Sequence, residues 1–473
     1  MAAPQEDAPK TTLAEDIRSL LASPRELWLI YAATFFEYLG IYSFLSTLKF
    51  WLSSDHGMGD VSAGTWASVF STVATFFVVL VGPLADVVGI RRMLLFSFSF
   101  AAVTRLAMSA APERVTALVS LFAFAFAYAS TSPVLQVSVM RAASKQARAF
   151  AFSTWYVSFN LAGVAVGFII DGTRAHFRDA ANHLVRRPVP IPLLGHVTMS
   201  AHAAILAQGF AFAVVAAVII SFIRKDFGAA PEADRTGEPY RAAAPPDAAP
   251  SVVGRVRAAL AELLVKLREV MGDRLFWRFM FMLVLLSLVK LIFQHMHLTW
   301  PTYVTRMEGE AFPVGRVWAL NSFLILFLAP LCTAITRRQK ALDVLLAGAF
   351  ITAASPFILC FGSSIYHQVT MVVVLTIGEA LWSPRSYEYN VSISPPGREA
   401  TYVSLAALPF FLAKAIVGSF GGVLLDRFCP DHGPRQPAVL WALIGLVTMV
   451  GPVGILTLRD WIAGKPRDAA KAA

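Results

Sequence analysis

A stripe of polar side chains interrupts the apolar segment 276–304. Lys290, Gln294 and His297 follow the spacing i, i+4, i+7, so all three lie on one face of a helix. His295 is turned away from this face, toward a neighbouring helix. Such a stripe indicates either a water-filled cavity or a seam of hydrogen bonds between helices. In the first interpretation Lys290 binds an anion, and Gln294 and His297 complete a substrate-binding site.

A second stripe lies in the apolar segment 367–392. Its polar residues share one helix face and are Glu379, Ser383, Ser386 and Asn390. Pro384 is expected to break the helix beside them, which would expose backbone groups near the middle of a membrane. Glu379 either neutralises Lys290 across the helices or binds the amine of a substrate whose carboxylate binds Lys290. The two interpretations are compatible, and the second predicts a zwitterionic solute.

An isolated carboxyl, Glu37, lies near the middle of the apolar segment 27–52. Even permissive scales assign an ionisable residue at mid-membrane a cost of about 2.5–3.5 kcal/mol, so such a residue is a functional candidate. A buried carboxyl suits reversible protonation, which makes Glu37 and Glu379 the candidate proton-coupling residues. The alternative is that Glu37 is the permanent structural partner of a buried base such as Arg105.

The composition explains why charges inside these segments matter. Of the 473 residues, 57% are apolar and 15% are charged, whereas a soluble domain has roughly 45–50% apolar and about 25% charged residues. The mean hydropathy is +0.62. These values exclude a soluble enzyme, a disordered scaffold and a disulfide-rich secreted domain. The net charge of +10 does not indicate nucleic-acid binding, because the basic residues cluster in short loops between apolar segments.

Twelve segments contain the roughly 20 apolar residues that a membrane-spanning helix needs. They form two sets of six: 27–52, 62–85, 93–111, 115–140, 149–170 and 202–223, then 276–304, 315–336, 342–361, 367–392, 401–425 and 437–458. The expected fold is an all-α membrane protein with an N-terminal six-helix bundle, 27–223, and a C-terminal one, 276–458. The linker between them, 224–275, contains an amphipathic helix over 251–273 that is expected to lie on the membrane surface.

The distribution of Lys and Arg predicts how the chain is oriented. The loops after the second, fourth, eighth and tenth segments carry more Lys and Arg than the opposite short loops, which places them in the cytoplasm. The terminal segments, 1–26 and 459–473, are then cytoplasmic as well. The composition, rich in Ala and Arg, suits a bacterial inner membrane. Residues 1–24 lack the features of a signal peptide, and the three distant cysteines indicate neither a metal site nor a disulfide framework.

The turn between the second and third segments has the sequence GPLADVVGIRR, residues 82–92. A carboxylate at this helix end can face the positive N-terminus of another helix, the second glycine permits a tight turn, and the arginines can hold that carboxylate or lipid phosphates. The turn is similar to the loop motif of the major facilitator superfamily. This resemblance implies a conformational latch formed by Gly82, Asp86, Gly89, Arg91 and Arg92. The alternative is an ordinary basic turn that fixes the topology.

The two halves of the chain also repeat weakly. Residues 82–92 match APLCTAITRRQ at 329–339, and Ser132-Pro133 in the fourth segment matches Ser383-Pro384 in the tenth. Repeats of this kind are typical of transporters that expose a central site alternately to the two sides of a membrane.

Three segments narrow the resemblance to the proton-dependent oligopeptide transporter family: 129–138, 149–167 and 378–397. Tyr156 and Asn160 match its F-Y-x-x-x-N-x-G pattern, which implies a role in substrate binding. Glu379 aligns with the acid that faces the substrate amine in that family. Trp382 is an aromatic residue that can line the same pocket.

The chain departs from that family at residues that bind peptide carboxylates and couple protons. Glu37 matches the second acid of the family's E-x-x-E-R motif, but Thr34 stands in place of the first acid and Tyr38 in place of the Arg. Ser132 replaces the Lys of the fourth helix, a charge that Lys290 would partly restore. The expected substrate is therefore a small polar or zwitterionic solute, peptide-like solutes included.

The sequence thus predicts a secondary active transporter that works by alternating access and couples solute uptake to protons. The alternatives are a proton-coupled exporter of drugs or metabolites and a non-transporting membrane receptor. Because the chain has no G-x-x-x-x-G-K-S/T phosphate loop, ATP is not expected to drive transport directly. No catalytic residue, metal or other cofactor is expected. The expected partners are the solute, protons and the lipid bilayer, without nucleic acid, and the protein is expected to be a monomer.

Overall fold

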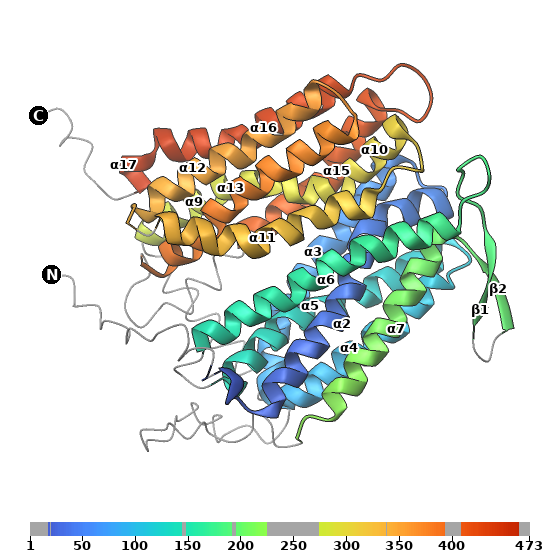
Figure 1. The fold of residues 1–473 in the computed structure, drawn as a ribbon, viewed down its shortest axis with the longest axis horizontal. Helices are drawn as coiled ribbons and strands as arrows, with labels where there is room; N and C mark the ends of the chain where they lie inside the picture. Colours follow the sequence, from blue (N-terminus) through green and yellow to red (C-terminus); the bar gives the residue numbers. More distant parts are fainter. Residues whose placement is uncertain are drawn as a thin grey trace, which may run out of the picture.

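The computed structural model describes residues 18, 20–143, 148–191, 195–224, 274–336, 338–392 and 408–462. This part of the chain is almost entirely helical (Figure 1). The amphipathic helix predicted over 251–273 lies outside the described residues, as do the terminal segments 1–17 and 463–473.

The first half of the chain consists of long helices and one β-hairpin. The first of these helices continues directly into a short π-helical segment, η1, and the hairpin precedes α7. The elements are α2 (Arg25–Phe50), η1 (Trp51–Asp55), α3 (Asp60–Val88), α4 (Ile90–Ser109), α5 (Arg114–Ala142), α6 (Arg148–His176), β1 (Arg187–Ile191), β2 (Gly195–Met199) and α7 (Ala201–Ser221).

The second half is entirely helical over the described residues. Two of its spans are extended by a second helical piece, α10 after α9 and the 3₁₀ segment η2 after α12. The elements are α9 (Arg274–Leu298), α10 (Trp300–Glu308), α11 (Val314–Thr336), α12 (Ala341–Ala354), η2 (Ser355–Cys360), α13 (Ile365–Ser392), α15 (Leu408–Phe428), α16 (Pro437–Thr457) and α17 (Arg459–Ile462).

These helices lie at the positions of the predicted spans, apart from residues 401–407, which fall outside the described part of the chain. Ten helices of the described residues are long and apolar enough to cross a membrane. The other two long helices, α4 and α15, each carry three charged residues in an otherwise apolar sequence. The prediction of an all-α membrane protein is therefore confirmed.

Two details differ from what the sequence suggested. The prediction that Pro384 breaks its helix is wrong, because α13 runs through it from Ile365 to Ser392. Proline removes only one intrahelical hydrogen bond, and packing against α11 and α12 supports the helix on either side. The segment between α6 and α7, where no secondary structure was predicted, contains the antiparallel pair β1–β2 in the register Arg187↔Met199.

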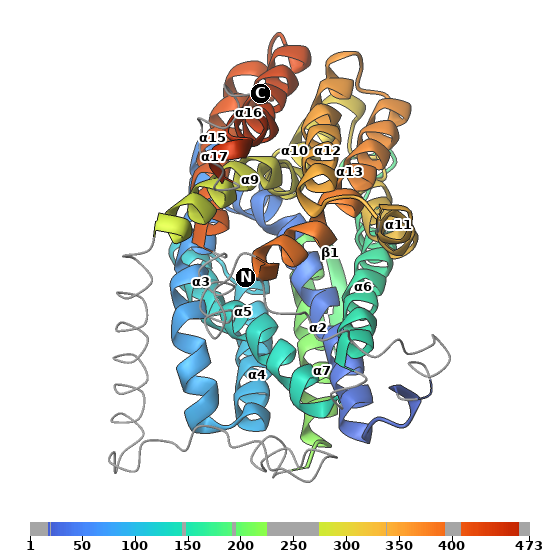
Figure 2. The ribbon, with the colours of Figure 1, turned by 90° about the vertical axis from the view of Figure 1, so that its left-hand side faces the viewer.

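The helices pack as two bundles, α2–α7 and α9–α17 (Figure 2). In the first bundle α7 packs on α2 and α4, and α5 packs on α3 and α4; in the second, α12 packs on α13 and α16, and α9 on α15 and α16. Each bundle has apolar clusters of its own, centred on residues such as Phe98 and Phe124 in the first and Trp300 and Trp441 in the second. In a bilayer such close packing, rather than the hydrophobic effect, holds helices together.

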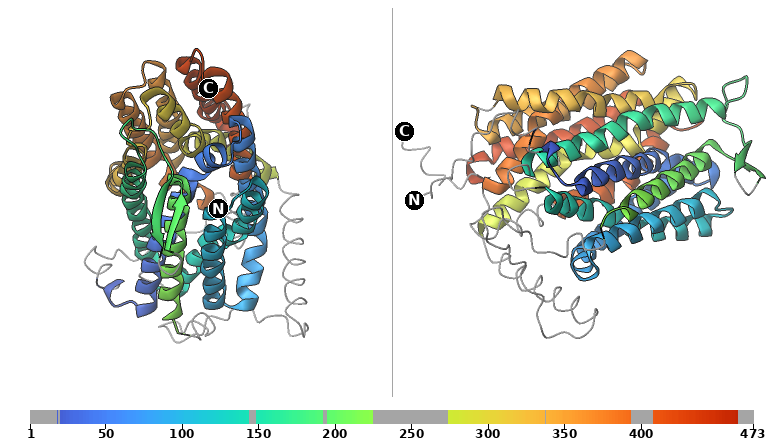
Figure 3. Two further views of the ribbon diagram at one scale, coloured as in Figure 1. Left: turned by 90° about the vertical axis from the view of Figure 1, so that its right-hand side faces the viewer. Right: turned by 60° about the horizontal axis from the view of Figure 1, so that its bottom comes forward.

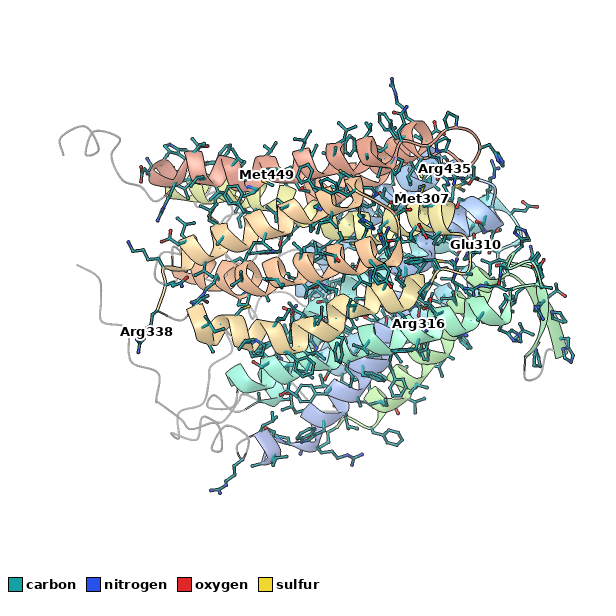
Figure 4. All side chains as sticks on the ribbon, turned by 45° about the horizontal axis from the view of Figure 1, so that its top comes forward. Met307, Glu310, Arg316, Arg338, Arg435 and Met449 are labelled. Carbon is teal, nitrogen blue, oxygen red and sulfur yellow. The ribbon has the colours of Figure 1, made fainter. Side chains whose placement is uncertain are left out.

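The β-hairpin marks one end of the molecule, here called the hairpin end (Figure 3). The opposite end, where α2 begins and α16 ends, is the terminal end. Glu310, Arg316 and Arg435 lie at the hairpin end, and Arg338 lies at the terminal end (Figure 4). The two bundles converge toward the hairpin end and diverge toward the terminal end (Figure 1).

Near the hairpin end the bundles touch through glycines. α3 crosses α15 at Gly64 and Gly418, and α6 crosses α11 at Gly167 and Gly315. A Cβ atom on any of the four would overlap the backbone of its partner, so only glycine permits these approaches. Gly418 lies in the glycine-rich stretch GSFGG of the eleventh predicted span, 418–422, so this stretch is a site of close helix packing.

Gly418→Ala is expected to loosen this crossing, because the added methyl group overlaps the Gly64 carbonyl. Gly172→Ala in α6 is the matched control, since nothing lies within 4 Å of a Cβ atom there. Alanine is favoured over glycine inside a helix by about 0.5–1 kcal/mol. The unfolding temperature in detergent should therefore fall for Gly418→Ala and stay level or rise for Gly172→Ala. Equal shifts in both variants would contradict a close crossing at Gly418.

Candidate functional site

Two buried charged side chains inside the first bundle form an ion pair. Arg105 of α4 donates through both terminal nitrogens to Glu37 of α2, with Nη2–Oε1 at 2.8 Å and Nη1–Oε2 at 3.0 Å. Both side chains are fully buried, and the guanidinium lies 4.9 Å from the ring centroid of Phe124. The prediction that Glu37 is isolated is wrong, and the alternative pairing with Arg105 is the one observed. A proton-coupling role for Glu37 stays a prediction.

Small residues make room for this pair. A Cβ on Gly40 would lie 2.7 Å from Arg105 Nη1, and one on Gly209 would lie 3.2 Å from Arg105 Cδ. The Gly209 carbonyl also accepts a hydrogen bond from Nη1 at 3.4 Å. The bidentate geometry and low local dielectric strengthen the pair.

A row of aromatic rings leads from the first bundle to the second. Its members pack edge to face, tilted or stacked, with successive ring centroids 4.9–5.5 Å apart. The row joins α6 and α2 of the first bundle to α11 and α9 of the second, in the order Tyr156, Phe159, Tyr38, Tyr42, Trp318 and His297. It therefore brings two predicted site residues, Tyr156 and His297, into one continuous surface.

The predicted acid of α13 is held by a residue that the sequence analysis missed. Asn321 of α11 donates to Glu379 Oε2 at 2.8 Å and to the Thr376 hydroxyl at 3.0 Å. Glu379 is half-buried. The missed signal was an asparagine in the middle of an otherwise apolar span, the same criterion that singled out the other polar residues.

The predicted cation of α9 lies in the same bundle as Glu379. Lys290 is half-buried, its Nζ lies 5.2 Å from the ring centroid of Trp382, and it interacts electrostatically with Glu379. Trp382 is buried and donates through its indole N–H to Thr352 at 3.1 Å. The structure thus brings together Lys290, Trp382 and Glu379. Lys290 and Glu379 carry opposite charges, and the Trp382 ring lies beside Lys290.

The remaining predicted site residues differ in how far they are available to a ligand. Asn160 is buried and donates to the backbone carbonyl of Tyr156 one turn earlier, at 2.9 Å. The carbonyl of Ser383 accepts from the hydroxyl of Ser386 at 2.7 Å. Gln294 and Ser383 are half-buried on their helices. His295 is buried against α15, with Thr299 2.8 Å away, as predicted from its position off the Lys290 face.

A network of charges closes the hairpin end between the bundles. Asp60 of α3 lies 3.1 Å from Lys49 of α2 and 2.6 Å from Arg306 of α10. Arg306 also binds Asp431 at 3.0 Å and the Cys429 carbonyl at 2.8 Å. Burial opposes the charged form of Arg306, but the hydrogen bond and charge of Asp60 outweigh it and raise the pKa of the guanidinium.

Two further contacts join α6 to the second bundle. Asp171 accepts from the backbone N–H groups of Gly315 and Arg316 at 2.8 and 3.0 Å, and from the Arg316 side chain at 3.0 Å. A carboxylate at the first residues of α11 is favoured by the positive end of the helix. Arg174 pairs with Glu310 in the loop before α11.

The family model of the major facilitator superfamily matches residues 30–408. The chain belongs to this superfamily. It is a multi-pass membrane protein with a transporter fold rather than an enzyme. No group of three His, Cys, Asp or Glu among the described residues is arranged to hold a metal ion. No curated protein sequence matches this superfamily member.

Solved structures similar to this superfamily member are POT family transporters. The in meso crystal structure of PepTSo has 17% identity and a TM-score of 0.71, and the match covers 94% of this chain and 99% of that one. A POT family transporter in complex with 5-aminolevulinic acid has 15% identity and a TM-score of 0.67, covering 93% and 97%. Tetrameric PepTSo2 has 15% identity and a TM-score of 0.65, covering 92% and 98%. At these identities the likeness shows the fold.

The superfamily motif at residues 82–92 is only partly described. The side chains of Gly82-Pro83 and of Asp86 lie outside the described part. Gly89 has φ +91°, a backbone conformation that glycine readily adopts, so the predicted tight turn is confirmed. Arg91 donates to the carbonyls of Ser221 and Ile223 at the end of α7, at 2.9 and 2.7 Å, and Arg92 is exposed. Arg91 thus satisfies the last carbonyls of a neighbouring helix.

Replacing one partner of the Glu37–Arg105 pair is expected to strand a buried charge. Removing one member of a buried ion pair destabilises a protein by about 3–5 kcal/mol, so Glu37→Gln should lower the unfolding temperature markedly. The double variant Glu37→Gln/Arg105→Gln should recover part of the loss, because no charge is then left unpaired. Glu308→Gln, at an exposed acid of α10, is the control and should change little. A Glu37→Gln variant as stable as this control would show that the pair is not structural.

Proposed function

We propose that this superfamily member is a secondary active transporter that carries a small zwitterionic solute together with protons by alternating access. The observation that carries the proposal is the half-buried pair Lys290 and Glu379 on α9 and α13, set beside Trp382. Charged side chains inside a bilayer are costly unless they are neutralised. A solute with a carboxylate at one end and an amine at the other can pair its carboxylate with Lys290 and its amine with Glu379, so that neither side chain is left unpaired.

The surroundings of this pair support a solute of limited size. Asn321 fixes Glu379 on one side, and the aromatic row from Tyr38 to His297 crosses from the first bundle toward α9. Aromatic faces favour cations and flat apolar parts of a ligand. 5-Aminolevulinic acid, named in the complex of one similar POT transporter, carries both an amine and a carboxylate, which agrees with the proposed class.

The arrangement of the bundles supports alternating access. Ion pairs and glycine crossings join the bundles near the hairpin end, whereas the bundles diverge toward the terminal end (Figure 1). In the proposed cycle these contacts break when the hairpin end opens. We place the terminal end in the cytoplasm of a bacterial inner membrane, on the Lys and Arg distribution. We assign the latch role to the turn with Gly82, Asp86 and Gly89, and take a monomer as the transporting unit.

Reconstituted transport with three forms of one probe tests the substrate class. Dialanine has both charges, N-acetyl-dialanine lacks the amine charge, and dialanine amide lacks the carboxylate. Proteoliposomes with an inward proton gradient should accumulate dialanine and neither blocked form. Accumulation of all three forms, or extrusion driven by the opposite gradient, would instead favour the exporter of drugs or metabolites.

Charge-neutralising variants connect this selectivity to the two residues. Lys290→Gln should reduce dialanine uptake by about tenfold or more, because a lost charge-assisted hydrogen bond is worth roughly 1.5–3 kcal/mol. The variant should also show a smaller difference in uptake between dialanine and dialanine amide. Glu379→Gln should show a smaller difference in uptake between dialanine and N-acetyl-dialanine. Glu308→Gln is again the matched control. Wild-type affinity in the double variant Lys290→Gln/Glu379→Gln would sink the assignment of this site.

The coupling role of Glu37 needs a variant without a stranded arginine. Glu37→Gln/Arg105→Gln has no charge left in the pair and should exchange labelled dialanine across the membrane, because exchange does not require a proton to leave. It should fail to accumulate dialanine against a gradient if Glu37 carries the coupled proton. Normal gradient-driven accumulation by this variant would remove Glu37 from coupling and leave Glu379 as the candidate.

A further inference from the structure

A second cluster of ionisable groups lies at the hairpin end, away from Lys290 and Glu379. His202, the second residue of α7, is 5% exposed, and its Nδ1 lies 3.1 Å from Oδ1 of Asp55 at the end of η1. The Ser200 hydroxyl donates to the other carboxylate oxygen at 2.5 Å. Because a carboxylate only accepts hydrogen bonds, Nδ1 carries the proton of the neutral imidazole, and Nε2 is left as an acceptor.

The free side of the His202 ring faces a small cavity between the bundles. The cavity has a volume of about 10 Å³ and is lined by Ser46, Arg174 and His202 of the first bundle and by Gly315 and Trp318 of the second. His202 Nε2, Arg174 Nε and Ser46 Oγ are buried and have no hydrogen-bond partner within the described part of the chain. One water molecule needs a volume of this size and two to four polar partners. The cavity therefore suits a single water that joins these three atoms.

This cavity connects His202 to an ion pair between the bundles. Arg174 pairs with Glu310, which precedes α11 in the second bundle. His202 stacks on the Phe50 ring with centroids 5.6 Å apart and an angle of 6°, and the Arg174 guanidinium lies 5.3 Å from the centroid of the same ring. His202 is thus connected to Arg174 both through the Phe50 ring and through the cavity that suits one water.

The cluster is accessible from the surface of the hairpin end. A cavity of about 380 Å³ is lined by Asp55, His202 and Glu310 together with the exposed residues His183 and Arg186. Protons from this side of the membrane can therefore reach His202 without passing through the bundles.

We propose that His202 is a proton-binding site, and that its protonation opens the hairpin end by weakening the Arg174–Glu310 pair. In the protonated ring both nitrogens are donors, so Nε2 and Arg174 Nε then compete for one water. The new positive charge also repels the Arg174 guanidinium across the cavity. Both effects favour a position of Arg174 farther from His202. In the proposal this movement weakens the pair of Arg174 with Glu310 and so favours separation of α6 from the second bundle.

Charged groups of both signs surround the ring. Asp55, Glu310 and Arg186 line the outer cavity with His202, Arg174 lines the inner one, and Asp171 lies near Arg174. Two other histidines are near. Burial lowers the pKa of His56, with Arg114 and Arg186 adding to the shift and Asp55 opposing it. His183 is exposed and lines the outer cavity.

The inference rests on the proposed proton-coupled transport for its role, but its test measures conformation alone and needs no substrate. Val115 of α5 and Tyr366 of α13 are 68% and 81% exposed near the hairpin end of the two bundles. Spin labels on Val115→Cys and Tyr366→Cys, with the three native cysteines replaced, report the separation of the bundles by pulsed electron paramagnetic resonance. Acidification from about pH 8 to about pH 5, the range in which histidine titrates, should increase the population with the longer distance.

His202→Gln should abolish this pH response, and Asp55→Asn should move its midpoint to lower pH, because the imidazolium then lacks its carboxylate. Glu310→Gln should show the longer distance at both pH values. His183→Gln and His56→Gln are the matched controls and should respond as the wild type does. A pH response that survives in His202→Gln would overturn the proposal, whether or not it disappears in one of the controls. A wild type whose distance does not change with pH would overturn it as well. Failure of zwitterion transport with this response intact would reject the proposed substrate and leave the proton site standing.

Discussion

The backbone contacts at the two glycine crossings set the geometry on which the other features depend. With no side chain at Gly64 and Gly418, α3 and α15 approach closely enough for the Gly418 N–H to donate to the Ser68 hydroxyl at 2.8 Å and for the Ser419 hydroxyl to donate to that of Thr65 at 3.0 Å. The second crossing, Gly167 with Gly315, places Asp171 2.8 and 3.0 Å from the N–H groups of Gly315 and Arg316. These approaches also bring Tyr42 of α2 to 5.2 Å from Trp318 of α11. A bulkier residue at either crossing would move every one of these groups apart.

The interactions within the bundles differ in kind from those between them. The large apolar clusters belong to single bundles: one draws only on α2–α7, another adds only Leu298 from the second bundle, and those of the second bundle draw on α9–α17. Between the bundles the contacts are small residues, hydrogen bonds, ion pairs and the aromatic contact of Tyr42 with Trp318. The Arg306–Asp60 pair is largely buried, so its charges can separate at low cost only where water enters between the bundles and solvates them. Two well-packed bodies joined in this way can move apart without disrupting either core.

The sequence predicted what is local and periodic. Runs of about 20 apolar residues located the helices within a few positions, and the spacing of Lys290, Gln294 and His297 correctly separated them from His295. It named Arg105 as an alternative partner of Glu37 but could not decide for it, because the two residues are 68 positions apart and their approach depends on how α2 and α4 both pack on α7. Asn321 was missed because an asparagine carries no charge to draw attention in an apolar span. Pro384 was misjudged because proline propensity is local, whereas α13 continues through it while packed against α11 and α12.

The charges inside the membrane fall into two classes, which bear differently on transport. Glu37 and Arg105 are fully buried and satisfy each other with two hydrogen bonds, so exchanging either partner for a solute means separating charges in a low dielectric. Lys290 and Glu379 are half-buried, and Glu379 accepts a hydrogen bond from the neutral amide of Asn321. A half-buried carboxylate with such a partner can take a ligand's opposite charge at a smaller cost. The free energy of binding a zwitterion is therefore available at the second pair and not at the first. In the proposed mechanism Glu37 can act only through protonation, and this step leaves the buried Arg105 charge without its partner, at the same kind of cost that Glu37→Gln is expected to show.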